Sequence, residues 1–376
     1  MSVATRVIQS AMLALLSVSL AAGCARDRTN SELNSAPSTK QRAKDSVLGE
    51  SIVDGTMFQN RLWLWSATGG LVAFDLEKQT REVIFEQGVI SVRKNGDDLW
   101  ILRTPAPLPK DRPPTELVLS NWRENRPVDF PRPKAANDSA VIGFSIYRGS
   151  PAIIFHDSIQ ILSENKSSWS SLPLRGKFYG ALYRSIISLP IDDEVYAGSN
   201  FGEWGGGLQS INIATGEVHA IERRDRDEII CGGPLNSQCH PITGIIPDPQ
   251  NSHCVLASVG LIHLMQDGRV LRVCGGNVEI FFDKKTTQRI DSARSIDVSE
   301  AIFGLASAPS GAVWVLGTRN LWNFVNGQAT EMPLPKFESS QGLHFTRALP
   351  GVIVIATTIN WSMSLSGYTS LLIPLE

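Results

Sequence analysis

The sequence predicts an all-β fold, a β-propeller of seven four-stranded blades. Two observations favour this fold. A string of alternating apolar and polar residues, broken by short turns, recurs along the chain, and no stretch from Ile52 to Glu376 has the spacing of an amphipathic helix. A lone four-stranded sheet exposes both faces, whereas a closed ring of twisted sheets buries them against one another. The alternative is a pair of β-sandwich domains, which would show alternation without a repeated order of turns.

The repeat is clearest in "LWLWSATGGLVAFDLEKQT" (Leu62 to Thr80) and "AVWVLGTRNLWNFVNGQAT" (Ala312 to Thr330). Each reads as strand, turn, strand, turn, strand, and a further apolar segment such as "SIVDGTMF" stands before it. Four strands in about 36 to 60 residues is the period of a propeller blade. We expect the ring to close by pairing between strands from the two ends of the chain. Five looser copies begin at Leu99, Ala152, Glu194, Cys254 and Gly351.

The first of these strings resembles the repeat of the two-component-regulator propeller family. That repeat reads approximately Leu-Trp-hydrophobic-Gly-Thr, then Gly-Leu, then an aromatic residue and Asp, and "VWVLGTRNLWNF" matches it comparably well. The resemblance implies the propeller fold and a sensing or ligand-binding role. Such propellers usually precede transmembrane and signalling segments, and we expect this chain not to signal by itself.

The N-terminus has the pattern of an export signal. Arg6 is followed by a largely apolar run from Val7 to Leu20, which is too short and interrupted to span a membrane. The run ends in "LAAGC", which resembles a bacterial lipobox and implies that Cys24 becomes the lipidated first residue, carrying acyl chains such as palmitate. A lipobox usually has Leu where Ala21 stands. The alternative is ordinary signal cleavage near Ala22.

These features divide the chain into three parts: a lipoprotein signal peptide (1–23), a flexible tether (24–46) and the propeller (47–376). The tether is rich in Ser, Asn, Lys, Arg and Asp, and it has too little apolar surface to offset chain entropy. By resemblance to the sorting rules of enteric bacteria, Ala25 after the lipidated cysteine points to the outer membrane. We therefore expect a protein of the bacterial cell envelope whose membrane contact is its N-terminal lipid.

Charge and motifs restrict the chemistry. The net charge is −2 and the pI about 6.3, so no strong field favours nucleic acid. The sequence lacks a Gly-x-Ser-x-Gly elbow, a His-Glu-x-x-His zinc motif, a phosphate loop and a Gly-x-Gly-x-x-Gly turn. We expect no catalytic residues, no metal ligands and no cofactor.

Four cysteines beside Cys24 lie within one blade and its entry loop, and an even number in an exported protein suggests two disulfides. Four cysteines allow three connectivities, and the favoured one pairs Cys231 with Cys239. The remaining pair, Cys254 with Cys274, is awkward if these residues stand on the second and fourth strands of a blade. A zinc site is the alternative, but the spacing fits no common zinc finger.

The longest inserts are all expected on one rim of the propeller, because turns between second and third strands share a rim with the connections between blades. The inserts are Thr104–Pro114, Asn200–Gly207, Glu222–Pro241 and Gly275–Ser299. The most unusual is "NFGEWGGG", whose glycines permit positive φ and whose Trp204 either contacts a ligand or packs over the loop. The expected binding residues are Asn200, Glu203, Trp204, Arg224 and His240, completed from neighbouring blades by His156, Asp157, Arg319 and Asn360.

These observations favour a lipid-anchored periplasmic or surface propeller that binds a protein, peptide or glycan without catalysis. Two alternatives remain. One is a metal-dependent enzyme of the propeller lactonase or lyase kind, which holds a divalent cation over the channel with Glu, Asn and Asp. The other is a scaffold that assists outer-membrane protein assembly.

Overall fold

The computed structural model describes most of the chain beyond residue 51. The described ranges are 52–66, 68–75, 77–78, 80–109, 112–134, 139–179, 186–224, 231–263, 265–308, 310–333, 342–349, 352–358 and 368–374. The expected signal peptide, Cys24, the tether and Asn360 lie outside them.

The first three blades are four-stranded antiparallel sheets in which the strands follow chain order. Blade 1 contains β1 (Ile52–Phe58), β2 (Arg61–Ser66), β3 (Leu71–Asp75) and β4 (Thr80–Phe85). Blade 2 contains β5 (Val89–Asn95), β6 (Asp98–Arg103), β7 (Val118–Arg123) and β8 (Arg126–Asp129). Blade 3 contains β9 (Val141–Tyr147), β10 (Ser150–Phe155), β11 (Ser158–Leu162) and β12 (Trp169–Pro173).

Blades 4, 5 and 6 repeat this order. Blade 4 contains β13 (Ile186–Ile191), β14 (Glu194–Asn200), β15 (Gly206–Asn212) and β16 (Val218–Ile221). Blade 5 contains β17 (Ile242–Pro247), β18 (Cys254–His263), β19 (Met265–Cys274) and β20 (Asn277–Phe282). Blade 6 contains β23 (Ile302–Ser307), β24 (Val313–Gly317), β25 (Asn320–Val325) and β26 (Gln328–Pro333).

A seventh sheet has three described strands: β27 (Gly342–Leu349), β28 (Val352–Thr358) and β29 (Tyr368–Pro374). Within the described ranges the helical content is a single 3₁₀ turn, Gly202–Trp204. The all-β, four-stranded-blade propeller predicted from the sequence is therefore confirmed.

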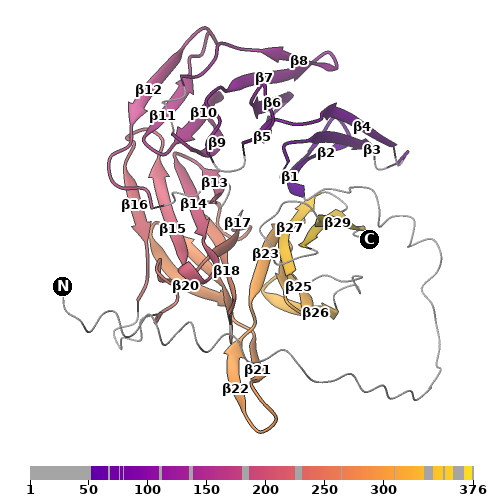
Figure 1. Ribbon diagram of the computed structural model, residues 1–376, viewed down its shortest axis with the longest axis vertical. Coiled ribbons are helices and arrows are strands. Elements are labelled where there is room, and N and C mark those ends of the chain that lie inside the picture. Colours follow the sequence, from indigo (N-terminus) through magenta and orange to yellow (C-terminus); the bar gives the residue numbers. More distant parts are fainter. Residues whose placement is uncertain are drawn as a thin grey trace, which may run out of the picture. The chain divides into compact units, whose positions relative to one another are not determined.

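The first strands of the blades form a closed circle. The first strand of each blade lies next to that of the following blade, and β27 of the last sheet lies next to β1 (Figure 1). Direct strand pairing between the two chain ends, which the sequence analysis expected, falls outside the described residues and stays a prediction.

Apolar faces of neighbouring blades pack against each other and form the core. Between blades 1 and 2 the buried side chains include Trp63, Trp65, Ile101 and Trp122. The rings of Trp63 and Trp122 meet edge to face, with centroids 5.0 Å apart. The aromatic residues of the repeat are thus core residues, and similar clusters join blades 2 and 3, 3 and 4, 4 and 5, and 5 and 6.

Two expectations about blade 5 are corrected. Cys274 ends β19, the third strand, so it stands directly opposite Cys254 on β18, and their Cα atoms are 4.5 Å apart. Both expected disulfides, Cys231–Cys239 and Cys254–Cys274, are present. Residues 275–299 are more than a blade connection, because they contain β20 and a separate hairpin of β21 (Lys285–Arg289) and β22 (Ser295–Ser299).

A largely buried arginine joins the first strands of three blades. Arg93 on β5 donates from Nη1 to Asp54 Oδ2 of β1 at 3.4 Å and from Nε to the Phe144 carbonyl of β9 at 3.0 Å. Its side chain is 19% exposed. Burial lowers the pKa of Arg93 to about 10, so the guanidinium is charged at neutral pH.

Arg93→Met should destabilise the protein by about 3 kcal/mol, because it removes the Arg93 ion pair from the buried Asp54 carboxylate. The matched variant Arg148→Met breaks an exposed ion pair with Asp193 that also links two blades, and it should cost at most about 1 kcal/mol. Chemical denaturation of both variants measures the difference. Equal losses would show that the buried pair does not hold the first strands together.

Candidate functional site

Long segments of blades 4 to 6 gather on one rim. Turns between second and third strands share this rim with the connections between blades, and we call it the connection rim. It carries the turn after β14, the connection from β16 to β17, the tip of the long β18–β19 hairpin and the β21–β22 hairpin. The β21–β22 hairpin projects well beyond the neighbouring sheets (Figure 1).

The turn between β14 and β15 presents Trp204 to solvent. Trp204 is 79% exposed, so it does not pack over the loop. The turn is held by hydrogen bonds within itself: the side-chain Oδ1 of Asn200 accepts from the Gly202 N–H at 2.9 Å, and the Trp204 N–H donates to the Phe201 carbonyl at 3.2 Å. Gly205 has a φ of 85°, and a Cβ there would collide with the backbone of Gln238. The exposed ring therefore stands on an ordered turn.

The stapled loop, residues 231–240, supports this turn from one side. Its disulfide joins Cys231 and Cys239, and Leu235 is fully buried beneath it. The Gly206 N–H donates to the Ser237 carbonyl at 2.9 Å, and the Gly207 N–H donates to the His240 carbonyl at 3.0 Å. Two backbone hydrogen bonds thus fasten the tryptophan turn to a loop that is itself cross-linked.

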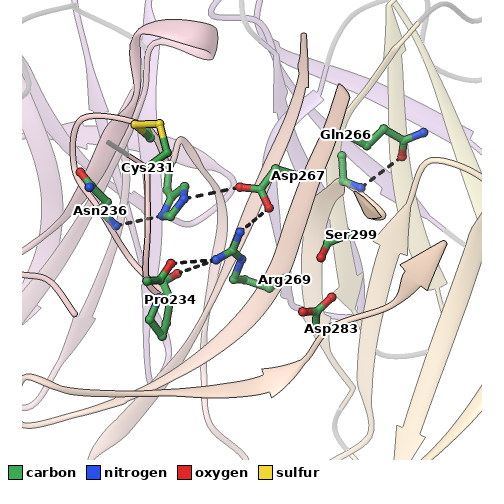
Figure 2. A network of polar contacts seen from close by, with 12 residues as sticks. Cys231, Pro234, Asn236, Gln266, Asp267, Arg269, Asp283 and Ser299 are labelled. Carbon is green, nitrogen blue, oxygen red and sulfur yellow. Dashed lines mark hydrogen bonds and ion pairs between the residues drawn. A yellow bond between two sulfur atoms is a disulfide. The ribbon is translucent and has the colours of Figure 1, made fainter. Parts of the chain in front are cut away.

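His240 is buried between the stapled loop and blade 5 rather than facing solvent. The Asn236 N–H donates to its Nδ1 at 2.9 Å, so the proton of the neutral ring is on Nε2, which lies 3.4 Å from Asp267 Oδ2 (Figure 2). Arg269 pairs with Asp267 and donates to the Gly233 carbonyl at 3.0 Å. Burial lowers the pKa of His240 to about 4, and the charge of Arg269 acts in the same direction, while Asp267 opposes both.

The other side of the stapled loop borders a cleft of about 540 Å³. Its walls come from the loop itself, the first half of β19, β20, and the β21–β22 hairpin. Half-exposed Met265 and Ile280 contribute apolar surface, and Asp267, Asp283, Asp297, Arg269 and Lys285 contribute charge. The stapled loop therefore contacts the tryptophan turn through Ser237 and His240 and borders a charged cleft through Gly233 and Pro234.

The structure brings some of the predicted residues together. Asn200, Glu203 and Trp204 share one turn, His240 lies buried behind it, and Arg224 pairs with Glu222 at 3.0 Å. Glu222 in turn accepts a hydrogen bond from the Ser237 N–H at 3.1 Å, which places this pair at the stapled loop. His240 is too buried to contact a partner, so its expected binding role becomes a positioning role.

Of the remaining predicted residues, His156, Asp157 and Arg319 occupy the corresponding turns of blades 3 and 6, while Asn360 lies outside the described residues. His156 packs edge-on against Phe178, and Asp157 accepts hydrogen bonds from Ser139 and Ser158. The Arg319 N–H donates to Glu300 Oε1 at 2.9 Å. None of these contacts links them to the tryptophan turn.

Sequence reasoning missed the charged residues of the cleft. Asp267 and Arg269 stand in a regular strand, while Asp283 precedes and Lys285 begins a hairpin that the sequence analysis treats as a plain connection. The alternating polar segment "KTTQRIDSARSIDVS", with its Asp-Ser turn, was the available signal for that hairpin.

Two kinds of site are not found in the described part of the chain. No group of three or more His, Cys, Asp or Glu residues there could hold a metal ion. No helix there is long and apolar enough to cross a membrane.

Comparisons with known proteins agree with the architecture. No known family model and no curated protein matches the chain. Among solved structures, the extracellular domain of BT4673 from B. thetaiotaomicron, named as a one-component or hybrid two-component system, is 12% identical with a TM-score of 0.51. That match covers 88% of this chain and 38% of the other.

Two further matches extend over nearly the whole length of the other protein. U3-55K is 12% identical with a TM-score of 0.54, covering 87% of this chain and 96% of that one. YCF48 from Cyanidioschyzon merolae is 12% identical with a TM-score of 0.52, and the match covers 86% of this chain and 95% of that one. The chain has the β-propeller fold. At these identities the likeness concerns the fold alone, and the propeller spans well under half of the BT4673 domain.

Acid should weaken the propeller through His240. The unfolded chain protonates this imidazole near pH 6.5, whereas the folded protein does so only near pH 4. The stability contributed by the neutral ring is therefore complete above pH 6.5 and is lost as the pH falls towards 4, on the order of 2 to 3 kcal/mol. In His240→Asn, the free energy of unfolding should lack this loss between pH 6.5 and pH 4. Denaturation curves across that pH range measure it, and identical slopes in both proteins would contradict the assignment.

Proposed function

We propose that the protein is a binding propeller of the bacterial cell envelope that recognises a protein, peptide or glycan on its connection rim, without catalysing a reaction. The observation that carries this proposal is Trp204, which is 79% exposed on an ordered turn. Large aromatic residues are enriched where proteins bind partners, because one ring supplies a large contact area with little conformational entropy to lose.

The support beneath Trp204 strengthens the argument. The backbone hydrogen bonds from Gly206 and Gly207 tie the turn to the stapled loop, and the disulfide limits the motion of that loop. A preorganised surface loses less entropy on binding than a flexible one. The exposed ring is thus arranged as a contact point.

The cellular address rests on the cysteines. Two disulfides are typical of proteins that fold in an oxidising compartment, and the BT4673 domain is named as extracellular. The pattern "LAAGC" adds a lipid anchor at Cys24, and Ala25 after it favours the outer membrane.

Placing a photo-reactive benzophenone amino acid at position 204 should yield a discrete cross-linked product in intact cells. The matched control is position 325, because Val325 is half-exposed at the turn between β25 and β26, on the opposite rim. Trp204→Ala should reduce recovery of the same partner and change stability by less than about 0.5 kcal/mol, since the ring is exposed. A large loss of stability with the partner retained would mean that Trp204 only supports the fold.

The lipid anchor is tested separately. A fatty-acid probe should label the wild type and not Cys24→Ser. The Cys24→Ser protein should also be absent from the membrane fraction, because the acyl chains hold the protein to the bilayer. Equal labelling of the two proteins would rule out Cys24 as the lipidated residue.

A further inference from the structure

The cleft beside the stapled loop contains more negative charge than it neutralises internally. Arg269 forms an ion pair with Asp267 and also donates to the carbonyls of Gly233 and Pro234 (Figure 2). The charges that remain are the carboxylates of Asp283 and Asp297 and the ammonium of Lys285. The cleft therefore favours a ligand with a positive charge.

Asp283 is the carboxylate with which a positively charged ligand group would pair. Its Oδ1 is buried and has no hydrogen-bond partner among the described residues, while its Oδ2 lies 2.7 Å from Lys285 Nζ. A carboxylate oxygen left without a donor in a largely buried position is costly. A group that brings additional donors to Asp283 would remove this cost.

Lys285 can give up its place at Asp283 easily. Its side chain is 71% exposed, and its other contact is a hydrogen bond to Ser299 Oγ at 2.9 Å. Ion pairs with an exposed lysine contribute little stability, because water competes for the ammonium and the long side chain loses entropy when it is fixed. A guanidinium from a ligand offers a planar fork of donors that can pair with both oxygens of one carboxylate.

The walls of the cleft suit an extended chain. β19 pairs with β18 over its full length but with β20 only from Val270 to Cys274, so Met265–Arg269 has no paired strand on its cleft side in the described structure, although the Gln266 N–H there donates to Gln288 Oε1 at 3.0 Å. Such an edge can accept main-chain hydrogen bonds from an added segment. Met265 and Ile280, both about half exposed, provide apolar contacts for the neighbouring side chains of that segment.

We propose that this cleft binds an extended segment of a protein partner that presents an arginine to Asp283, with apolar neighbours on Met265 and Ile280. Lys285 then acts as an internal stand-in that the arginine displaces. This inference rests on the proposed function, in which the connection rim binds a partner, and it specifies the chemistry of one part of that partner.

The test measures binding of a labelled peptide, acetyl-Ala-Val-Arg-Val-Ala-amide, to the purified full mature protein by fluorescence anisotropy. Asp283→Asn should weaken binding about tenfold or more, as expected for loss of a hydrogen-bonded charge pair. Lys285→Ala should strengthen binding severalfold, because the internal competitor is removed. The matched control is Lys284→Ala, which loses the same charge next along the chain, where Nζ contacts Glu331 at 2.9 Å, and it should leave the affinity unchanged.

The other outcomes overturn the inference. Equal affinity for the peptide with Glu in place of Arg, or binding of free spermidine as tight as that of the peptide, would exclude recognition of an arginine-bearing segment. Weaker binding by Lys285→Ala would exclude the stand-in role, and this variant keeps the test decisive should Asp283→Asn fail to fold. Absence of peptide binding while position 204 still cross-links a partner would overturn the cleft proposal and leave the proposed function standing.

Discussion

Burial of both faces of each sheet against its neighbours is the constraint on which the rest of this structure depends. Both faces of each four-stranded sheet are buried against neighbouring sheets. The tryptophans of the repeat, such as Trp63 and Trp122, fill the space between blades. Once the blades are stacked, the ends of their strands are fixed in space. Turns at those ends can then carry exposed or charged groups in defined positions, because the sheets beneath them supply the stability.

The connection rim of blades 4 and 5 shows how a long loop can be made rigid without secondary structure. The stapled loop has a covalent cross-link at Cys231–Cys239, a buried apolar anchor at Leu235 and a polar anchor at His240. Its outer edge then holds the tryptophan turn through backbone hydrogen bonds. Arg269 also donates to carbonyls of this loop, so the tryptophan turn and the cleft share one support. A structural change in either one would therefore alter the other.

The fold was predictable from the sequence, whereas the site was predictable only in part. Strand alternation and turn order place the segment "SIVDGTMF" on the first strand of blade 1, β1, because burial between blades forces this pattern on the residues. Trp204 and its glycines were also recognisable, since glycine is needed where Gly205 meets the Gln238 backbone. The position of Cys274 was misjudged because β18 and β19 are ten residues long, so the third strand ends later than in other blades. The cleft could not be foreseen, because Asp283 and Lys285 become neighbours of Asp267 and Arg269 only when the hairpin folds over β19.

The closed circle of first strands has a consequence for how such a protein can change during evolution. Adding or removing one blade would alter the angle between every pair of neighbours, so small changes in length cannot be absorbed by the sheets. A connection between blades has no such restriction. The β21–β22 hairpin enters between blades 5 and 6 while β20 and β23 keep their pairing with their own sheets. New binding surface can therefore be acquired at the rim by insertion, one loop at a time, without a compensating change in the core.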